Sequence, residues 1–205
     1  RMIVDLGSGL GGASEAFVND YSWIVKRFDN SDLVEDVPFT IKADYVEQTQ
    51  DIIDYIHVTK IEENIDEILI WASPECKEWS NGYSSRKSTM KRNGLIFVPD
   101  MTQLRAITQI INAINPEYYI IENVLGGVNY INTVFGDPKL IYRPWFFWGK
   151  FPQFRIDENR KHKTIKDPHS SNPLRYHIRS KIPIGISLSL KNAIENQKSL
   201  LEWIE

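Results

Sequence analysis

Short apolar runs alternate along the chain with longer segments in which apolar residues recur every three or four positions. The short runs predict strands at residues 3–6, 21–28, 39–42, 67–72 and 118–121, with two further short strands at 140–142 and 145–148. The periodic segments predict helices at 13–19, 46–55, 101–114 and 187–204. This alternation is typical of an α/β domain with a mostly parallel sheet and helices on both faces.

Two stretches lack a clear period. Residues 77–99 are rich in Ser, Lys, Arg and Gly and predict a mobile loop, and residues 130–183 read as irregular around the two short strands. Ligands of parallel sheets bind at the carboxyl ends of the strands. Glycine, acidic and cysteine residues follow the predicted strands at those points, namely 5–12, Asp29, 73–76 and Glu122.

The composition is that of one soluble globular domain. The chain has 205 residues, of which 42% are hydrophobic and 25% charged. A single cysteine, Cys76, excludes a disulfide scaffold and a CxxC zinc site. No run approaches the roughly 18 apolar residues of a membrane span, and no leader pattern opens the chain, so we expect no membrane contact and a cytoplasmic location.

The net charge of −3 hides a strong asymmetry. Residues 1–142 carry a net charge of −9, whereas residues 143–181 carry +7 and are interleaved with aromatic residues. A second basic cluster lies at residues 86–92. Such segments suit phosphates and unstacked bases, and a plain solvated face is the alternative. His162, His169 and His177 lack metal-ligand spacing, so we expect no metal.

A glycine loop links the first predicted strand to the first predicted helix. The run Asp5-Leu6-Gly7-Ser8-Gly9-Leu10-Gly11-Gly12 can let backbone approach a ligand closely. Asp29 ends the second strand, where a carboxylate can bind both hydroxyls of a ribose. Together they predict a nucleoside-containing cofactor. Asp44, after the third strand, is a candidate partner for an adenine amino group, or else a surface or capping residue.

A thiol and a carboxyl follow two neighbouring strands. Cys76 stands in Ser73-Pro74-Glu75-Cys76 just after one strand, and Glu122 begins Glu122-Asn123-Val124 at the end of the next. An inert core cysteine is the alternative for Cys76, but its polar neighbours argue against it. The arrangement predicts a nucleophile and an acid in one cleft.

The ordered set of motifs resembles that of the DNA cytosine-5 methyltransferases. The glycine loop is similar to their S-adenosylmethionine loop, 73–76 to their Pro-Pro-Cys motif, and 122–124 to their Glu-Asn-Val motif. Pro152-Gln153-Phe154-Arg155 resembles their Pro-Gln-x-Arg motif, and Gly185-Ile186-Ser187 their final Gly-Asn-Ser. The resemblance is closest to small members from phages, archaeal viruses and prokaryotes that lack a large target-recognition domain.

The resemblance implies a Rossmann-like S-adenosylmethionine-dependent methyltransferase fold acting on a flipped cytosine of DNA in a prokaryotic or virus-infected cell. Cys76 would add to C6 of the base, Glu122 would support protonation at N3, and Arg155 would hold the pyrimidine carbonyl or a phosphate. S-adenosylmethionine, with S-adenosylhomocysteine as product, would be held by Asp5, Leu6, Gly7, Ser8, Gly9, Leu10, Gly11, Gly12, Asp29, Asn30, Asp44, Tyr45, Ser73 and Pro74. The nucleic acid would be held by Lys77, Arg86, Lys87, Lys91, Arg92, Arg160, Lys161 and Lys163.

The chain departs from the family pattern at four positions. Gly7 stands where Phe is usual, Glu75 replaces the second Pro, Asp157 replaces a second Arg, and Ile186 replaces Asn. A carboxylate at Glu75 is expected to raise the pKa of the Cys76 thiol. Gly7 and Glu75 leave a catalytically weakened nucleic-acid-binding homologue as one alternative. A tRNA cytosine-5 methyltransferase is another, because some relatives with this chemistry modify transfer RNA. A NAD-dependent dehydrogenase would leave the cysteine and glutamate motifs unexplained.

The predicted organisation is a catalytic core at 1–142, a basic, aromatic-rich segment at 143–184 and a closing helix at 185–205 that packs back on the core. The basic segment stands where larger members of the family insert a target-recognition domain. So short a segment predicts broad or very short sequence specificity, or a partner protein that confers it.

Overall fold

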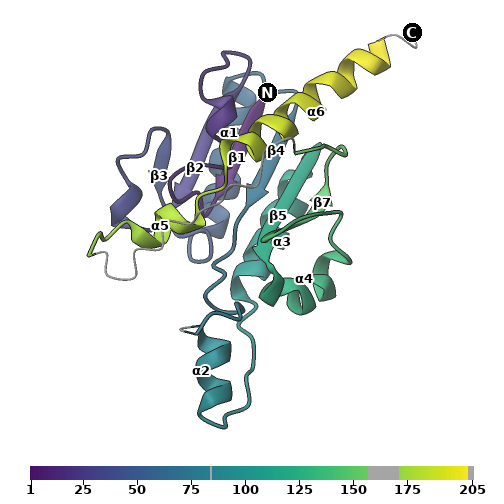
Figure 1. The fold of residues 1–205 in the computed structure, drawn as a ribbon. Helices are drawn as coiled ribbons and strands as arrows, with labels where there is room; N and C mark the ends of the chain where they lie inside the picture. The colour runs from purple at the N-terminus through teal and green to yellow at the C-terminus, as the bar shows by residue number, and fades with distance from the viewer. Residues whose placement is uncertain (84, 157–170, 203–205) are drawn as a thin grey trace.

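A seven-stranded mixed sheet forms the centre of the molecule (Figure 1). The computed structural model describes residues 1–83, 85–156 and 171–202, with side chains up to residue 197. The strands lie in the order β3-β2-β1-β4-β5-β7-β6. Their bounds are Met2–Leu6 (β1), Ile24–Asp29 (β2), Thr40–Lys42 (β3), Ile68–Ala72 (β4), Tyr118–Val124 (β5), Leu140–Tyr142 (β6) and Trp145–Lys150 (β7).

The first five strands are parallel, and β7 runs antiparallel between β5 and β6. The described helices are Thr49–Glu62 (α1), Arg86–Arg92 (α2), Thr102–Ile114 (α3), Val128–Phe135 (α4), Arg175–Ser180 (α5) and Ile184–Glu202 (α6). Single 3-10 turns lie at Glu15–Phe17 (η1), Asp32–Val34 (η2) and Leu125–Gly127 (η3). The prediction of an α/β domain with a mostly parallel sheet is confirmed.

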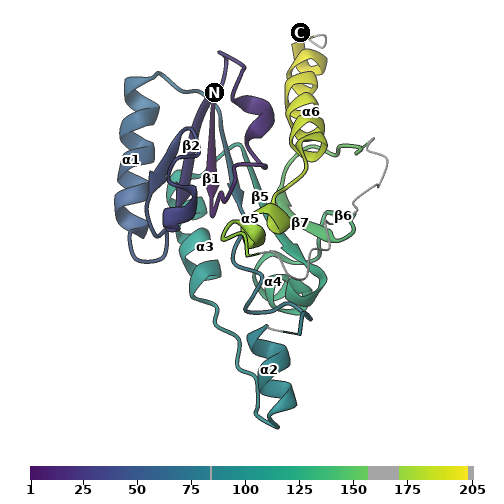
Figure 2. The ribbon, with the colours of Figure 1, turned by 60° about the vertical axis from the view of Figure 1, so that its left-hand side comes forward.

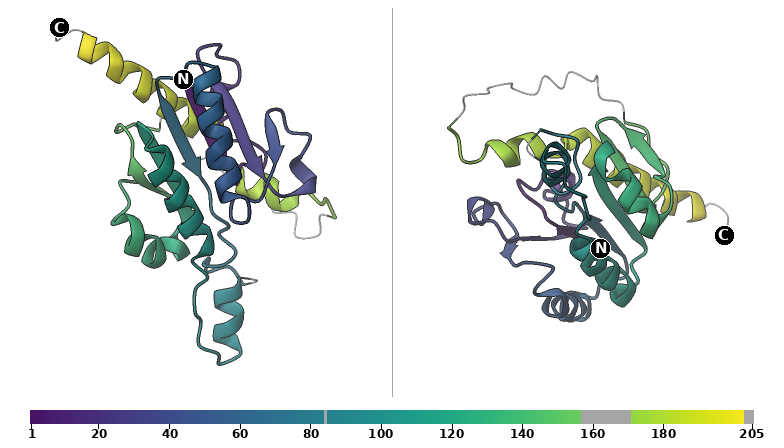
Figure 3. Two further views of the ribbon diagram at one scale, coloured as in Figure 1. Left: turned by 180° about the vertical axis from the view of Figure 1, so that it is seen from behind. Right: turned by 90° about the horizontal axis from the view of Figure 1, so that it is seen from below.

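Two apolar layers cover the two faces of the sheet. Along β4, Ile70 packs with α1 and α3, whereas its neighbour Trp71 packs with α6 on the opposite face. Figures 2 and 3 show α1 and α3 on one side of the sheet and α6 on the other. Because β1 and β4 are buried on both faces, neither alternates between apolar and polar residues: β4 is an unbroken apolar run, and β1 is apolar except for the buried Asp5.

The predicted helix at 13–19 is wrong: this segment holds only the 3-10 turn η1. Its backbone is tied to α6 instead, because the Ser187 hydroxyl donates to the Ala13 carbonyl and accepts from the Ala16 N–H. These contacts take up polar groups that a longer helix would pair within itself.

Three other boundaries differ from the sequence prediction. Helix α1 begins at Thr49 and not at residue 46, because the Asp44 carboxylate accepts from the Val46 N–H and forms a turn there. The predicted loop 77–99 contains α2, whose first turn is capped by the Ser85 hydroxyl. The predicted irregular region includes α4, an amphipathic helix. None of the described helices is long and apolar enough to cross a membrane.

The C-terminal part of the chain closes over the glycine loop. Strand β7, inside the basic segment of the sequence, lies between β5 and the edge strand β6, with Phe147 and Trp148 fully buried. The chain then reaches α6 through Ile182, whose carbonyl lies so close to Gly12 that a Cβ there would be 2.2 Å from its oxygen. Only glycine fits this contact.

We predict that Gly12→Ala lowers the free energy of unfolding by about 1–3 kcal/mol, since the added methyl group must push α6 away from the glycine loop. Urea denaturation measures the change. Gly82→Ala is the matched control, because a Cβ there would meet only the flexible Ser80 hydroxyl at 3.2 Å. Equal losses in the two variants would contradict the close contact.

Candidate active site

We call the carboxyl edge of the sheet between β1 and β4, where the strand order reverses, the crevice. From β1 the chain moves outward to β2 and β3 on one side, and then returns to β4 and β5 on the other. The loops that leave β1 and β4 therefore diverge at the carboxyl edge of the sheet, where α/β proteins bind ligands. The glycine loop and the Ser73–Cys76 segment are these two loops, and the predicted cofactor residues all lie at the ends of β1, β2, β3 and β4 or just after them.

The glycine loop has the backbone that its sequence predicts. Gly7, Gly9 and Gly11 have φ angles of 70°, 50° and 69°, a region that other residues rarely adopt. The Gly9 N–H donates to the Asp29 carboxylate at 2.8 Å. A Cβ at Gly7 would lie 2.8 Å from the Ser73 carbonyl oxygen, so the structure explains why this chain lacks the expected phenylalanine there.

Hydrogen bonds between three buried polar side chains support the glycine loop. The Arg27 guanidinium donates to the Ser14 hydroxyl at 2.8 Å, and that hydroxyl donates to the Asp5 carboxylate at 2.7 Å. Burial raises the pKa of Asp5 to about 6, against the opposing effects of Ser14 and Arg27. Oδ1 of Asp5 has no partner among the described residues. A buried acceptor without a partner marks a place where a ligand can donate a hydrogen bond.

The predicted ribose and adenine residues lie beside the loop. Besides Gly9, the Asp29 carboxylate accepts from the Ser31 N–H at 2.9 Å, which leaves lone pairs for two hydroxyl groups. Asn30 donates to the Asp44 carboxylate at 2.7 Å. Because Asp44 also caps Val46, the structure shows the capping function that the sequence left as an alternative, and a contact of Asp44 with adenine stays a prediction.

The cysteine segment is held by two side chains from outside the loop. Asn123 donates to the Pro74 carbonyl at 2.9 Å. Oε1 of Gln103, on α3, accepts from the Glu75 N–H at 2.7 Å and from the Tyr45 hydroxyl at 2.8 Å. The sequence analysis missed Gln103, since nothing in an amphipathic helix distinguishes one polar residue that turns inward.

The predicted meeting of thiol and carboxyl is consistent with the charges around Cys76. Glu122 and Glu75 both raise the pKa of the Cys76 thiol, after the larger effect of burial. Glu122 itself is buried at the end of β5 and bonded to the Ser73 side chain, and burial raises its pKa to about 7. At neutral pH this carboxyl can therefore both hold and release a proton.

Helix α5 lies across the crevice. The Tyr176 hydroxyl is 3.7 Å from Sγ of Cys76, and Nε2 of His177 is 3.2 Å from the Ser31 hydroxyl. The other ring nitrogen of His177 lies 3.5 Å from the Cβ position of Gly9. The sequence analysis treated Tyr176 as one aromatic residue of a basic segment and His177 as a surface or phosphate-facing residue, and thus missed both contacts.

The basic cluster at 86–92 lies on a protruding arm built from α2 and its flanking loops (Figures 1 and 2). No residue of α2 is buried. Arg86 is paired with Glu78, while Arg92 stacks on Tyr83 at 3.8 Å and Lys87 donates to Asn81 at 3.1 Å. The arm also exposes Ile96. Cations beside exposed rings and aliphatic groups form a surface suited to a polyanion with apolar faces.

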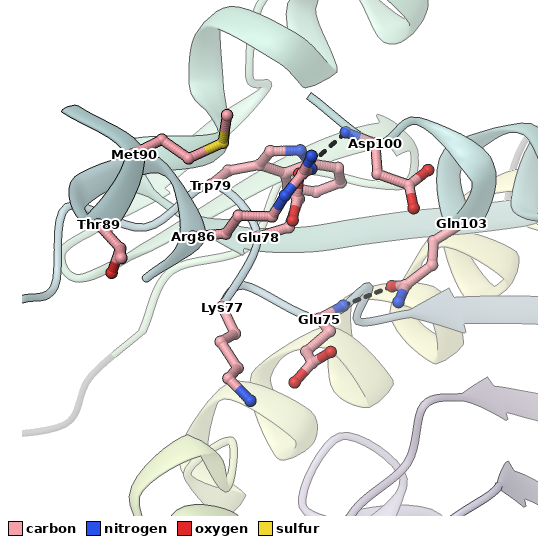
Figure 4. Close-up of a pocket in the computed structure, with 9 residues that line it drawn as sticks. All are labelled: Glu75, Lys77, Glu78, Trp79, Arg86, Thr89, Met90, Asp100 and Gln103. Carbon is pink, nitrogen blue, oxygen red and sulfur yellow. Dashed lines mark hydrogen bonds and ion pairs between the residues drawn. The ribbon is translucent and has the colours of Figure 1, made fainter. Parts of the chain in front are cut away.

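A cavity of about 410 Å³ separates the arm from the cysteine segment (Figure 4). Its walls are formed by Glu75, Lys77, Glu78, Trp79, Arg86, Thr89, Met90, Asp100 and Gln103. Lys77 thus lies between Cys76 and the arm, whereas Cys76 itself is not part of the cavity wall. The Glu78 carboxylate accepts from Arg86 and from the Asp100 N–H, and Phe97 and Lys87 of the arm contact the Tyr130 ring on α4.

The remaining predicted residues are either exposed or outside the part of the chain that the structure describes. Arg155 is exposed beside Phe154, which packs on Phe147 with ring centroids 6.4 Å apart, and its contact with a base stays a prediction. Asp157, Arg160, Lys161, His162, Lys163 and His169 lie outside the described residues. Among the residues that the structure describes, no group of three His, Cys, Asp or Glu could hold a metal ion.

Comparisons with known proteins give little beyond the site itself. No protein-family model matches the chain, and no curated protein sequence matches it. One similar solved structure is described as a candidate DNA modification methyltransferase encoded within a prophage of E. coli, at 16% identity and a TM-score of 0.45. The match covers 73% of this chain and 46% of that one, so the chain spans about half the length of its match.

We predict that Glu122→Gln stabilises the fold at alkaline pH. Between the unfolded pKa of about 4.3 and the folded value, the native carboxyl keeps a proton that the unfolded chain releases, so the native chain loses stability as pH rises to about 7. The neutral amide of the variant does not titrate and avoids this loss. The free energy of unfolding of the variant should therefore exceed that of the native chain by roughly 3 kcal/mol near pH 8.

Urea denaturation at several pH values tests this difference. The two chains should differ little near pH 4, because the Glu122 carboxyl is then largely protonated in both the folded and the unfolded chain. Glu62→Gln, at the exposed end of α1, is the control and should show no such trend. A pH-independent effect of Glu122→Gln would show that Glu122 is not held in a protonated state by burial.

Proposed function

We propose that the chain is a DNA cytosine-5 methyltransferase that uses S-adenosylmethionine. The observation that carries the proposal is the crevice formed by three adjacent strands: a glycine loop follows β1, a cysteine follows β4, and a buried glutamate with a pKa of about 7 lies in β5. The strand order agrees with a Rossmann-like methyltransferase fold that binds its cofactor at the reversal between β1 and β4.

Cys76 supplies the nucleophile of this proposal. C5 of cytosine reacts poorly with electrophiles until a thiolate adds to C6, which pushes electron density toward C5 and N3. Glu122 in its protonated form delivers a proton to N3 as the S–C6 bond forms. Transfer of the methyl group to C5 would release S-adenosylhomocysteine. Solvent water then takes the C5 proton, the S–C6 bond breaks to regenerate the thiolate, and N3 returns its proton to Glu122.

The residues of the glycine loop fit the proposed cofactor. The loop turns sharply after β1, with positive φ angles at Gly7, Gly9 and Gly11, and the Asp29 carboxylate beside it has lone pairs left for ribose hydroxyls. The unpartnered Oδ1 of Asp5 can accept from an ammonium group. When bound, S-adenosylmethionine supplies an electrophilic methyl group.

The arm fits the proposed nucleic-acid partner. A base inside a duplex cannot reach Cys76, so the target must be flipped out or single-stranded. Exposed cations on α2 can hold phosphates, while Tyr83 and Ile96 offer apolar surface to unstacked bases. The same surface can also hold RNA, so a tRNA cytosine-5 methyltransferase is the second candidate.

The charges around Cys76 favour a slow enzyme or a catalytically weakened homologue as a further candidate. Glu75, which replaces the expected proline, and Glu122 both oppose the thiolate. A nucleic acid bound at Lys77 and the arm would add further negative charge. We therefore expect turnover to rise with pH until Glu122 loses its proton.

Covalent trapping tests the proposal. DNA that contains 5-fluorocytosine cannot lose its C5 substituent, so the chain should form a denaturation-stable adduct through Cys76 that appears only with S-adenosylmethionine. Denaturing electrophoresis and mass spectrometry detect it, and Cys76→Ser should abolish it. Matched RNA and DNA substrates decide between the two acids, and a chain that binds both substrates and the cofactor without any adduct is the weakened homologue.

The arm is tested separately by salt dependence. Replacing both Lys87 and Lys91 with Gln should weaken DNA binding and reduce the slope of log K against log salt by about 1.8, since each phosphate contact contributes about 0.9 in duplex DNA. Lys60→Gln, at the opposite edge of the sheet where α1 leads to β4, is the control. An unchanged slope in the double variant would place the nucleic acid elsewhere.

A further inference from the structure

Tyr176 stands at the reacting sulfur although no motif of the sequence includes it. Its hydroxyl is 3.7 Å from Sγ of Cys76, within hydrogen-bonding distance for sulfur. The two residues are 100 positions apart, and Tyr176 belongs to α5, whereas Cys76 follows β4. Their contact is therefore made by the tertiary fold alone.

Several contacts fix α5 over the crevice. His177, next to Tyr176, contacts the Ser31 hydroxyl at 3.2 Å after β2. At the other end of the helix, Lys181 pairs with Glu15 at 2.9 Å, and Ile182 packs on Gly12. Tyr176 is thus held on the thiol from both sides and is not simply a surface residue that happens to lie near it.

The surroundings of Cys76 give the contact its chemical meaning. Glu75, on the same loop, and Glu122, on β5, both disfavour a negative charge on sulfur, and so does burial. The hydrogen bond from Tyr176 acts in the opposite direction and lowers the pKa of the thiol. Burial and the neighbouring Cys76 and Glu75 raise the pKa of Tyr176 itself, while Arg179 opposes them, so its hydroxyl keeps its proton and can donate.

We propose that Tyr176 is a further catalytic residue, whose hydroxyl donates a hydrogen bond to the Cys76 thiolate and so maintains a reactive sulfur between two carboxyl groups. A thiolate can only accept hydrogen bonds, and Tyr176 is a donor placed at its sulfur. The role in catalysis rests on the proposed function, whereas the hydrogen bond itself does not. It also explains how the chain can keep Glu75 beside its nucleophile.

The test measures the thiol directly on the intact chain, without DNA or cofactor. Cys76 is the single cysteine, so the rate of alkylation by iodoacetamide, followed by mass spectrometry across a pH series, reports its ionisation. A hydrogen bond to a charged group is worth about one pKa unit, so Tyr176→Phe should raise the midpoint by about one pH unit and slow alkylation roughly tenfold near pH 7.

The plateau rate at high pH separates ionisation from access. Tyr176→Phe keeps the ring, so the plateau rate should stay the same; a changed plateau with an unchanged midpoint would mean that Tyr176 only shields the sulfur and would overturn the proposal. A lowered midpoint would overturn it as well. Ile178→Ala, an exposed change on the same helix, should leave midpoint and plateau as in the native chain.

A second variant keeps the proposal testable from another side. His177→Ala removes the anchor on Ser31 and should move the midpoint in the same direction as Tyr176→Phe, by a smaller amount. If both midpoints rise but no methyl transfer is found, the hydrogen bond stands and the proposed function falls. If methyl transfer is found and neither midpoint moves, the proposed function stands and the role of Tyr176 falls.

Discussion

The hydrogen-bonded register of β1, β4 and β5 is the constraint on which the rest of the structure depends. Leu6 pairs with Ala72, which in turn pairs with Ile121, so Gly7, Ser73 and Glu122, the residues that come next, lie at one level. The next residues outward are therefore fixed relative to one another by backbone hydrogen bonds. The glycine loop, the cysteine segment and Glu122 need no other device to meet in one crevice.

This placement has an energetic cost that the apolar layers offset. Asp5 and Glu122 are buried carboxyls with raised pKa values, and each stabilises the fold less as pH increases. Two apolar layers, one on each face of the sheet, provide the rigid support that such groups require. The cations that would contact nucleic-acid phosphates lie instead on α2, a short element with no buried residue, which can adjust without disturbing the strand ends.

The sequence predicted best what depends on local pattern. Largely apolar runs located β1, β4 and β5, and with them the strand ends near which Cys76 and Glu122 stand. The sequence prediction failed where contacts between distant elements determine the structure. A hydroxyl of α6 binds the backbone at residues 13–16, where a helix was expected. Gln103 and Tyr176 contact the cysteine segment from α3 and α5. The glycine at position 7 looked like a defect in a motif, but it is required by the nearby Ser73 carbonyl.

The central claim is that Cys76 activates C5 of a cytosine, and the fate of the C5 hydrogen tests it most directly. DNA carrying tritium at C5 of cytosine would be incubated with the chain and S-adenosylmethionine, and tritium in water would be counted against methyl groups in DNA. We expect one tritium released for each methyl group transferred, and none with Cys76→Ser. Methylation without tritium release would mean that an amino group is the acceptor and that Cys76 does not activate C5.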